Sequence, residues 1–178
     1  MNQVNNKRRR DSQERIEKTF IQLIQNKEIY QVSVTEICKR AKINRTTFYA
    51  NYIDVYDLAD KVREKMINDF FSIYQEETEA KQHSYNFLKL FYHIKENPIF
   101  YKTYFKLSGD KDIPWDERYI NPEMIKFFGT TEKKDYHILF FKAGLNAVIK
   151  KWLKNGCMET PEQIEEIIKS EYKNKSLQ

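Results

Sequence analysis

Glycine, proline and cysteine are scarce in this chain of 178 residues, which contains four, four and two of them. Few turn-forming residues, together with mixed charges along helical faces, favour a mostly helical protein. The length allows one or two domains with a real core. Two cysteines, Cys38 and Cys157, suit free thiols in a reducing compartment better than a disulfide framework.

Long apolar runs and signatures of catalysis are also missing. No run approaches the ~20 residues that cross a bilayer, and no apolar segment of a secretory signal follows the basic N-terminus. The three histidines lack zinc spacing, and neither a phosphate loop nor a nucleophile elbow occurs. We therefore expect a cytoplasmic protein that has no membrane partner, metal, cofactor or enzymatic activity.

Positive charge is concentrated at one end of the chain. Residues 1–55 hold 11 basic and 6 acidic residues, a difference of +5 that equals the net charge of the whole chain. A basic head on a neutral body is typical of a protein that binds a polyanion at one end. Residues 1–10 are predicted to be a disordered basic arm that contacts phosphates or the minor groove through Lys7, Arg8, Arg9 and Arg10. A merely solvated charge cluster is the alternative.

Residues 33–52 (SVTEICKRAKINRTTFYANY) predict two short helices joined by a tight turn. Ser33 and Glu36 have the spacing of a capping box, and Asn44 is a plausible N-cap for the second helix. That helix opens with polar residues, and Phe48 would anchor it to the core. The pattern fits a helix-turn-helix that enters the major groove, although any αα-hairpin could show it.

The rest of the chain predicts about nine helices in all. The domains expected are a DNA-binding domain over 11–56 and a helical regulatory and dimerisation domain over 57–178. Residues 108–122 are expected to be a loop. The expected helices outside the motif cover 11–26, a long segment from Asp54, 84–95, 98–107, 122–129, 133–155 and a last helix that begins at Thr160-Pro161. The helix over 133–155 is apolar around most of its circumference, which indicates burial on several sides or against a partner.

The run ICKRAKINRTTFYANYIDVYDL resembles the tetracycline-repressor (TetR) family of bacterial transcriptional regulators. The resemblance is strongest over residues 12–58. The end of the chain, FFKAGLNAVIKKWLKNGCMETPEQIEEII, is similar to the paired dimerisation helices of the family branch that includes regulators of dihydroxyacetone kinase operons. The resemblance implies a DNA-binding head, a body that dimerises, and a small-molecule site in that body.

Residue roles follow from this resemblance. It implies that Arg45, Thr46 and Thr47 lie at base edges or nearby phosphates, which suits their chemistry. The DNA-binding set is completed by Ser33, Thr35, Asn44, Tyr49, Asn51 and Tyr52. The implied dimer interface comprises Phe141, Gly144, Leu145, Val148, Trp152, Ile164, Ile167 and Ile168. Aromatic residues concentrated in the body suggest a pocket lined by Tyr92, Tyr101, Tyr104, Phe105 and Phe127, with core packing as the alternative.

Two positions depart from the family pattern. Lys42 stands at the turn where members often have glycine, which implies a small strain or a different geometry. Val55 stands where many have a lysine at the start of the fourth helix, so that phosphate contact is either lost or replaced by Tyr56 or Lys61.

These observations predict a homodimeric, sequence-specific regulator that binds a pseudo-palindromic site on double-stranded DNA. A small apolar or aromatic effector would shift its conformational population. Repression is the expected mode. A co-activator of the same fold and a helical protein-interaction module remain the alternatives.

Overall fold

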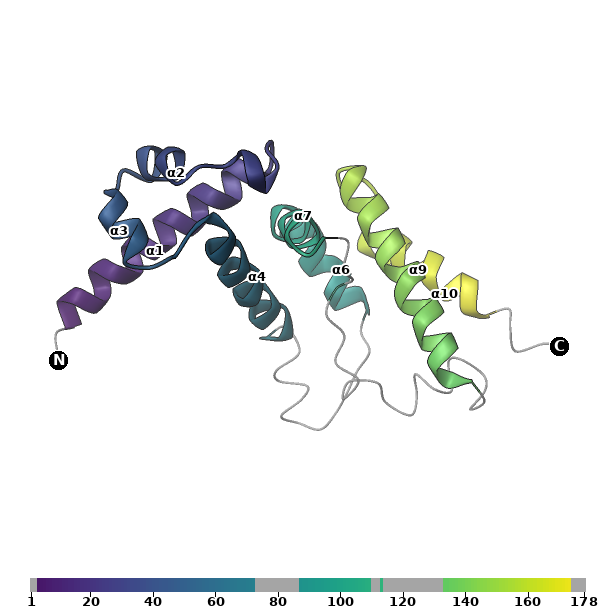
Figure 1. Ribbon diagram of the computed structural model, residues 1–178. Coiled ribbons are helices and arrows are strands. Elements are labelled where there is room, and N and C mark those ends of the chain that lie inside the picture. The colour runs from purple at the N-terminus through teal and green to yellow at the C-terminus, as the bar shows by residue number, and fades with distance from the viewer. Residues whose placement is uncertain (1–2, 73–86, 110–112, 114–132, 174–178) are drawn as a thin grey trace. The chain divides into compact units, whose positions relative to one another are not determined.

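The computed structural model confirms an all-α protein (Figure 1). It describes residues 3–72, 87–109, 113 and 133–173. Over these residues it contains eight α-helices and one short 3-10 helix, η1. The elements are α1 (Gln3–Ile24), η1 (Ile29–Gln31), α2 (Val34–Ala41), α3 (Arg45–Tyr49), α4 (Val55–Ser72), α6 (Phe87–Glu96), α7 (Pro98–Leu107), α9 (Lys134–Lys154) and α10 (Pro161–Lys173). None of these helices is long and apolar enough to span a membrane.

The chain divides into two compact units, Met1–Met66 and Ile67–Gln178. The boundary lies within α4, ten residues beyond the predicted domain boundary at 56/57. The predicted helix over 122–129, Phe127 and most of the loop over 108–122 lie outside the described residues.

The core of the first unit is apolar and is shared by α1, α2, α3 and the start of α4. Ile16, Phe20, Leu23 and Ile24 form a buried stripe along α1, and Ile37, Phe48 and Leu58 from the other helices complete the core. Helix α2 packs against α1, and α3 packs against α2 (Figure 1). Three-helix packing of this kind stabilises helices that are too short to persist alone.

Helix α1 begins earlier than the sequence predicted. It starts at Gln3, so the basic residues 7–10 are helical and the expectation of a disordered arm was wrong. Arginine, lysine and glutamine have high helix propensity, and the Ser12 hydroxyl donates a 2.9 Å hydrogen bond to the Arg8 carbonyl. The continuous helix therefore fixes the directions in which the basic side chains point.

Both ends of α2 are set by local chemistry. The Ser33 hydroxyl accepts a 3.2 Å hydrogen bond from the Glu36 N–H, as predicted for an N-cap. The Glu36 carboxylate instead bonds to Lys27 at 2.8 Å and to Arg40 at 3.2 Å. The Lys27 hydrogen bond lowers the pKa of Glu36. At the other end, Lys42 adopts the left-handed conformation, with φ 53° and ψ 52°.

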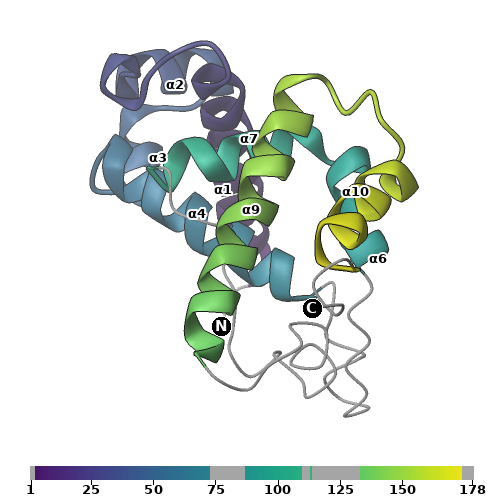
Figure 2. The same cartoon turned by 90° about the vertical axis from the view of Figure 1, so that its right-hand side faces the viewer.

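The second unit packs α6 against α10 and α7 against α6 and α9 (Figure 2). The Trp152 ring meets Phe91 edge-on at 6.1 Å between centroids, and its indole N–H donates to the Glu159 carbonyl at 3.2 Å. The predicted cap of α10 is confirmed, because Thr160 and Gln163 exchange hydrogen bonds of 3.3 and 2.8 Å. Gly156, with φ 76°, follows the C-cap residue of α9, where glycine is favoured.

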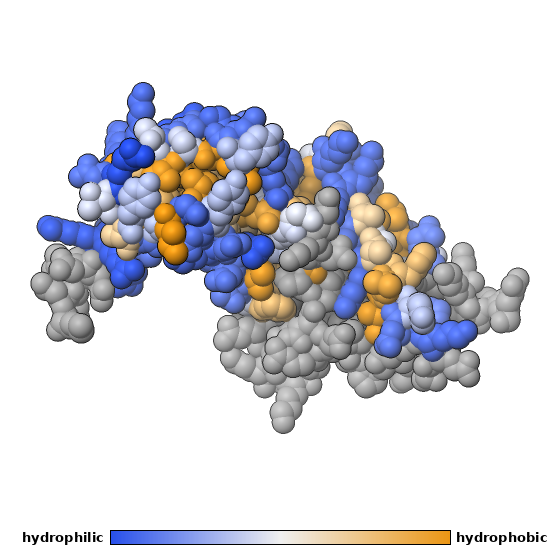
Figure 3. All heavy atoms as spheres, viewed as in Figure 1, coloured by the Kyte–Doolittle hydropathy of each residue, from blue (hydrophilic) through white to orange (hydrophobic). Residues whose placement is uncertain are grey.

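Helix α9 is buried on one face and exposed on the other, whereas its sequence indicated burial on several sides or against a partner. Its buried face includes Phe141, Leu145, Ile149 and Trp152. Its opposite face exposes Tyr136, Leu139 and Phe140 to solvent. Figure 3 shows orange side chains over this part of the surface. Both faces carry apolar residues, so the sequence alone could not distinguish them.

The conformation of Lys42 yields a stability prediction. A left-handed lysine costs about 1–2 kcal/mol, and glycine relieves that strain at the expense of some chain entropy. Lys42→Gly should therefore raise the free energy of unfolding by about 0.5–1 kcal/mol, measured by urea denaturation of the full chain.

The matched control removes the same charge from the exposed helical position Lys39. Lys39→Gly should lower the free energy of unfolding by about 1 kcal/mol. If Lys42→Gly is as destabilising as Lys39→Gly, the left-handed conformation at Lys42 is wrong.

Candidate nucleic-acid interface

Helix α3 presents the polar residues that the sequence singled out. Asn44 is its N-cap residue by position, although its side chain makes no capping hydrogen bond. Arg45 and Thr46 are exposed, and Thr47 is half-buried. One turn of helix therefore carries an arginine, two hydroxyls and an amide on the outer side of the unit.

Phe48 holds α3 to the first unit. Its side chain is fully buried, with 0% of its surface exposed. Its ring packs 5.6 Å from the centroids of both Tyr49 and Tyr52. Tyr49, the next residue along α3, remains 53% exposed. Its predicted phosphate contact is sterically open.

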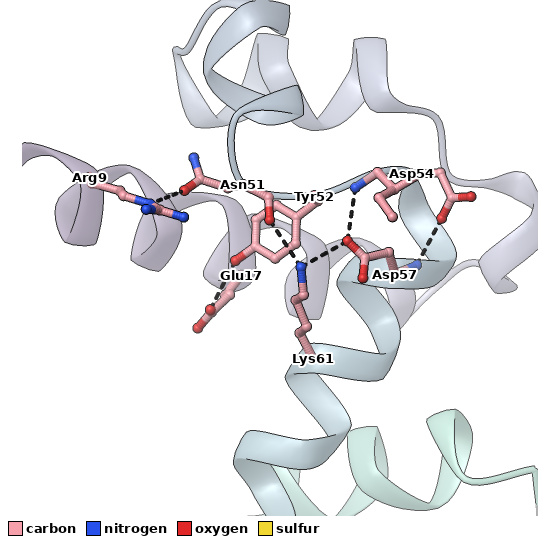
Figure 4. A network of polar contacts seen from close by, with 8 residues as sticks. Arg9, Glu17, Asn51, Tyr52, Asp54, Asp57 and Lys61 are labelled. Carbon is pink, nitrogen blue, oxygen red and sulfur yellow. Dashed lines mark hydrogen bonds and ion pairs between the residues drawn. The ribbon is translucent and has the colours of Figure 1, made fainter.

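Tyr52 is not available to DNA, which corrects its assignment as a phosphate donor. Its side chain is only 2% exposed, and its hydroxyl donates a 3.0 Å hydrogen bond to Glu17 Oε1. Burial, followed by the negative charge of Glu17, raises the pKa of Tyr52. The phenol is therefore a protonated structural donor inside the unit (Figure 4).

Glu17 is a structural residue that the sequence reading did not identify. Its Oε1 accepts from Tyr52, and its Oε2 lies 2.9 Å from Lys65 Nζ. One carboxylate thus connects α1, the segment after α3, and α4. The sequence offers no signal for this role, because Glu17 is one of several acids on a helix rich in charge.

The start of α4 is occupied by its own carboxylates. Asp54 accepts from the Asp57 N–H at 2.8 Å, and Asp57 accepts from the Ile53 N–H at 2.8 Å. That backbone hydrogen bond, followed by the one from Lys61, lowers the pKa of Asp57. Val55, at the position where relatives often carry lysine, is buried.

Lys61 is paired with neighbouring groups at the surface of the unit. Its ammonium donates to the Asn51 carbonyl at 3.2 Å and to Asp57 at 3.0 Å. It also lies 5.2 Å from the centroid of the Tyr52 ring. Tyr56 and Lys61, the two replacements considered for the missing lysine, are both exposed, but the Lys61 ammonium is already paired with Asp57.

The other predicted DNA-binding residues fall into two groups. Ser33 and Thr35 lie at the exposed start of α2. Asn51 directly follows α3 and accepts a 3.1 Å hydrogen bond from Arg9 Nε. The structure thus brings the basic part of α1 next to α3, whereas the sequence placed it on a separate arm.

The pocket predicted in the second unit is only partly assembled. Tyr92 is 45% exposed and its hydroxyl bonds to Glu162 on the surface, so it is not the wall of an enclosed site. Tyr101 and Tyr104 are buried on α7. The Tyr101 hydroxyl lies 2.7 Å from His93 Nδ1, and the half-buried Phe105 lies 5.0 Å from Lys150 Nζ.

Most of the predicted dimer contacts are buried within the chain itself. This corrects the assignment of Phe141, Leu145, Trp152, Ile164 and Ile168. These apolar residues fill the core that α9 and α10 share with α6 and α7, so they cannot also be the main contacts of a partner. Gly144 and Ile167 are exposed, and Val148 is half-buried.

The first unit has the architecture of a helix-turn-helix DNA-binding domain, with an exposed polar second helix. The body that follows is helical over the described residues. The TetR-type family described as "Transcriptional regulator C-terminal region" matches residues 81–171, just over half of the chain. The chain therefore belongs to the TetR-type transcriptional regulators, and it is not an enzyme.

Two known proteins are similar to it. One is the HTH-type dhaKLM operon transcriptional activator DhaS of Lactococcus lactis subsp. lactis (strain IL1403). It is 29% identical over 130 residues, which are 71% of this chain and 66% of the relative, just under two thirds of its length. The other is a solved structure of the dihydroxyacetone kinase operon activator DhaS. It has a TM-score of 0.56 and 22% identity, and the match covers 91% of this chain and 96% of that one. This second likeness supports the fold.

Proposed function

We propose that this regulator binds double-stranded DNA sequence-specifically through α3. The observation that carries the proposal is the division of that helix into a buried anchor, Phe48, and an exposed polar first turn. A helix so short has no independent stability, and its attachment to the core leaves Arg45, Thr46 and Thr47 at the surface. Their donors and methyl groups suit the base edges of the major groove.

The proposed regulator acts as a homodimer, so its partner is a second copy of the same chain. The exposed face of α9 carries Tyr136, Phe140, Ala143 and Ala147 at helical spacing, with Gly144 beside them. A monomeric protein rarely exposes such a continuous apolar stripe. An isologous contact along this face would bury it and place two heads on one pseudo-palindromic site.

A further question is whether the regulator represses or activates transcription. Repression was the first expectation from the sequence, with co-activation as its alternative. Both similar proteins are named as activators, which favours activation. A small effector that binds the body remains part of the proposal, and Tyr101, Tyr104 and Phe105 are its candidate contacts in the described residues. A protein-interaction module is the second candidate, favoured only by the exposed apolar face.

Arg45→Ala tests the DNA-binding proposal. It should weaken binding to the preferred duplex by about 1–3 kcal/mol and relax one base position. Binding to a scrambled duplex should change little. Fluorescence anisotropy with both labelled duplexes measures the difference.

Equal losses on both duplexes would make Arg45 a phosphate contact instead. If the unaltered protein binds every duplex equally, sequence-specific regulation is the wrong function for this head. The conservative variant Arg45→Lys keeps the charge but loses bidentate recognition, so it should resemble Arg45→Ala on the preferred duplex and the unaltered protein on the scrambled one.

Gly144→Glu tests the dimer. A Cβ atom at Gly144 would meet no atom within 4 Å, Gly144 is exposed and glutamate favours helix, so the monomer should fold. In a two-fold contact the added charges would face each other or an apolar surface, and sedimentation should show a loss of dimer at micromolar concentration.

Gly144→Ala is the matched control and should remain dimeric with a slightly more stable helix. A Gly144→Glu variant that keeps the dimer affinity of the unaltered protein would exclude this face of α9 as the interface.

A further inference from the structure

On one flank of the recognition helix, the lysine is already paired with a carboxylate. On that side the N-terminus of α4 is capped by Asp54 and Asp57, and Lys61 is held by Asp57 and the Asn51 carbonyl. A phosphate brought here would meet two carboxylates and a cation already in use. The start of α4 is therefore a poor phosphate site in this chain.

The other flank of α3 faces the basic part of α1. Arg9 lies seven residues before Ile16 and eleven before Phe20, so it continues the buried stripe of α1 by helical spacing. The Arg9 side chain therefore points toward the segment after α3, where its Nε donates a hydrogen bond to Asn51 Oδ1 at 3.1 Å (Figure 4). The bond uses one of the five N–H donors of arginine.

Asn51 connects this arginine to the recognition helix. While its Oδ1 accepts from Arg9, its Nδ2 donates a 2.8 Å hydrogen bond to the carbonyl of Thr47. Both ends of the amide are therefore used within the protein. The Asn51 side chain therefore links the Arg9 guanidinium to the backbone of α3 at Thr47.

An open groove separates the two helices at this point. It has a volume of about 490 Å³ and is lined by Arg8, Arg9, Ser12, Thr46, Thr47, Ala50 and Asn51. Two guanidinium groups and three hydroxyls line it, and none of the lining residues is acidic. The Ser12 hydroxyl donates to the Arg8 carbonyl, so the donors that suit an anionic phosphate oxygen are the guanidinium groups of Arg8 and Arg9 and the hydroxyls of Thr46 and Thr47.

We propose that this groove binds a phosphate of the DNA backbone, with Arg9 and Arg8 as its contacts and Asn51 as the residue that positions Arg9. The inference rests on the proposed DNA-binding function and adds to it a specific phosphate clamp on α1. The clamp fixes the register of α3 on the duplex without reading sequence. Asn51, first assigned as a DNA contact, acts through Arg9.

Salt dependence tests the clamp. Each phosphate contact contributes a slope of about −0.9 to the dependence of log K on log salt. Arg9→Ala should flatten that slope by about 0.9 and weaken binding on the order of five- to ten-fold at ~100 mM salt. The loss should be the same on the best duplex selected from a random pool and on its scrambled copy, measured by anisotropy.

Arg10→Ala is the matched control. It removes the same charge from the neighbouring position, which the helical period places on another face of α1, so the slope should change much less. If Arg9→Ala and Arg10→Ala flatten the slope equally, the cluster acts only as diffuse charge and the clamp is wrong. If the unaltered protein binds neither duplex, the proposed function itself fails.

A double-mutant cycle tests the role of Asn51. Asn51→Ala should weaken binding when Arg9 is present and add little when Arg9 is already alanine, because its effect passes through that side chain. The melting temperature should fall only slightly, because the Arg9 bond is exposed and a single part-buried hydrogen bond, to the Thr47 carbonyl, is lost with it. Additive losses in the double variant would show that Asn51 does not position Arg9.

Discussion

The burial of Phe48 is the interaction on which the DNA-binding head depends. Helix α3 has only five residues, too few to remain folded without tertiary contacts. A fully buried phenylalanine contributes on the order of 1.5–3 kcal/mol through the surface that it removes from water. That burial turns the first turn of α3 outward, so the same contact that stabilises the helix also determines which residues can meet DNA.

Some charged side chains of the first unit form ion pairs with one another, and others line an outer groove. Glu17 accepts a hydrogen bond from Tyr52 and forms an ion pair with Lys65, while Asp57 forms an ion pair with Lys61. These groups hold the segment after α3 against α1 and α4. The cations in this network pair with carboxylates of the unit, whereas Arg8 and Arg9 on α1 line an outer groove. Net charge alone does not reveal this division.

The sequence predicted features that depend on neighbouring residues and missed those that depend on packing. The caps at Ser33 and Thr160 and the anchor Phe48 follow from short patterns, and all three are found as expected. Tyr52 was misassigned because its burial depends on α1 packing beneath it. The buried face of α9 was likewise taken for an interface, because both faces of that helix are apolar and only the fold shows which one its own chain covers.

The central claim is that α3 reads base sequence from a two-fold protein. Selecting bound duplexes from a random pool with the full-length protein tests it most directly. The account predicts enrichment of an inverted repeat whose half-sites are centred about one helical turn of DNA apart, or a multiple of it. Binding that enriches no sequence, or enriches a single unrepeated site, would contradict it.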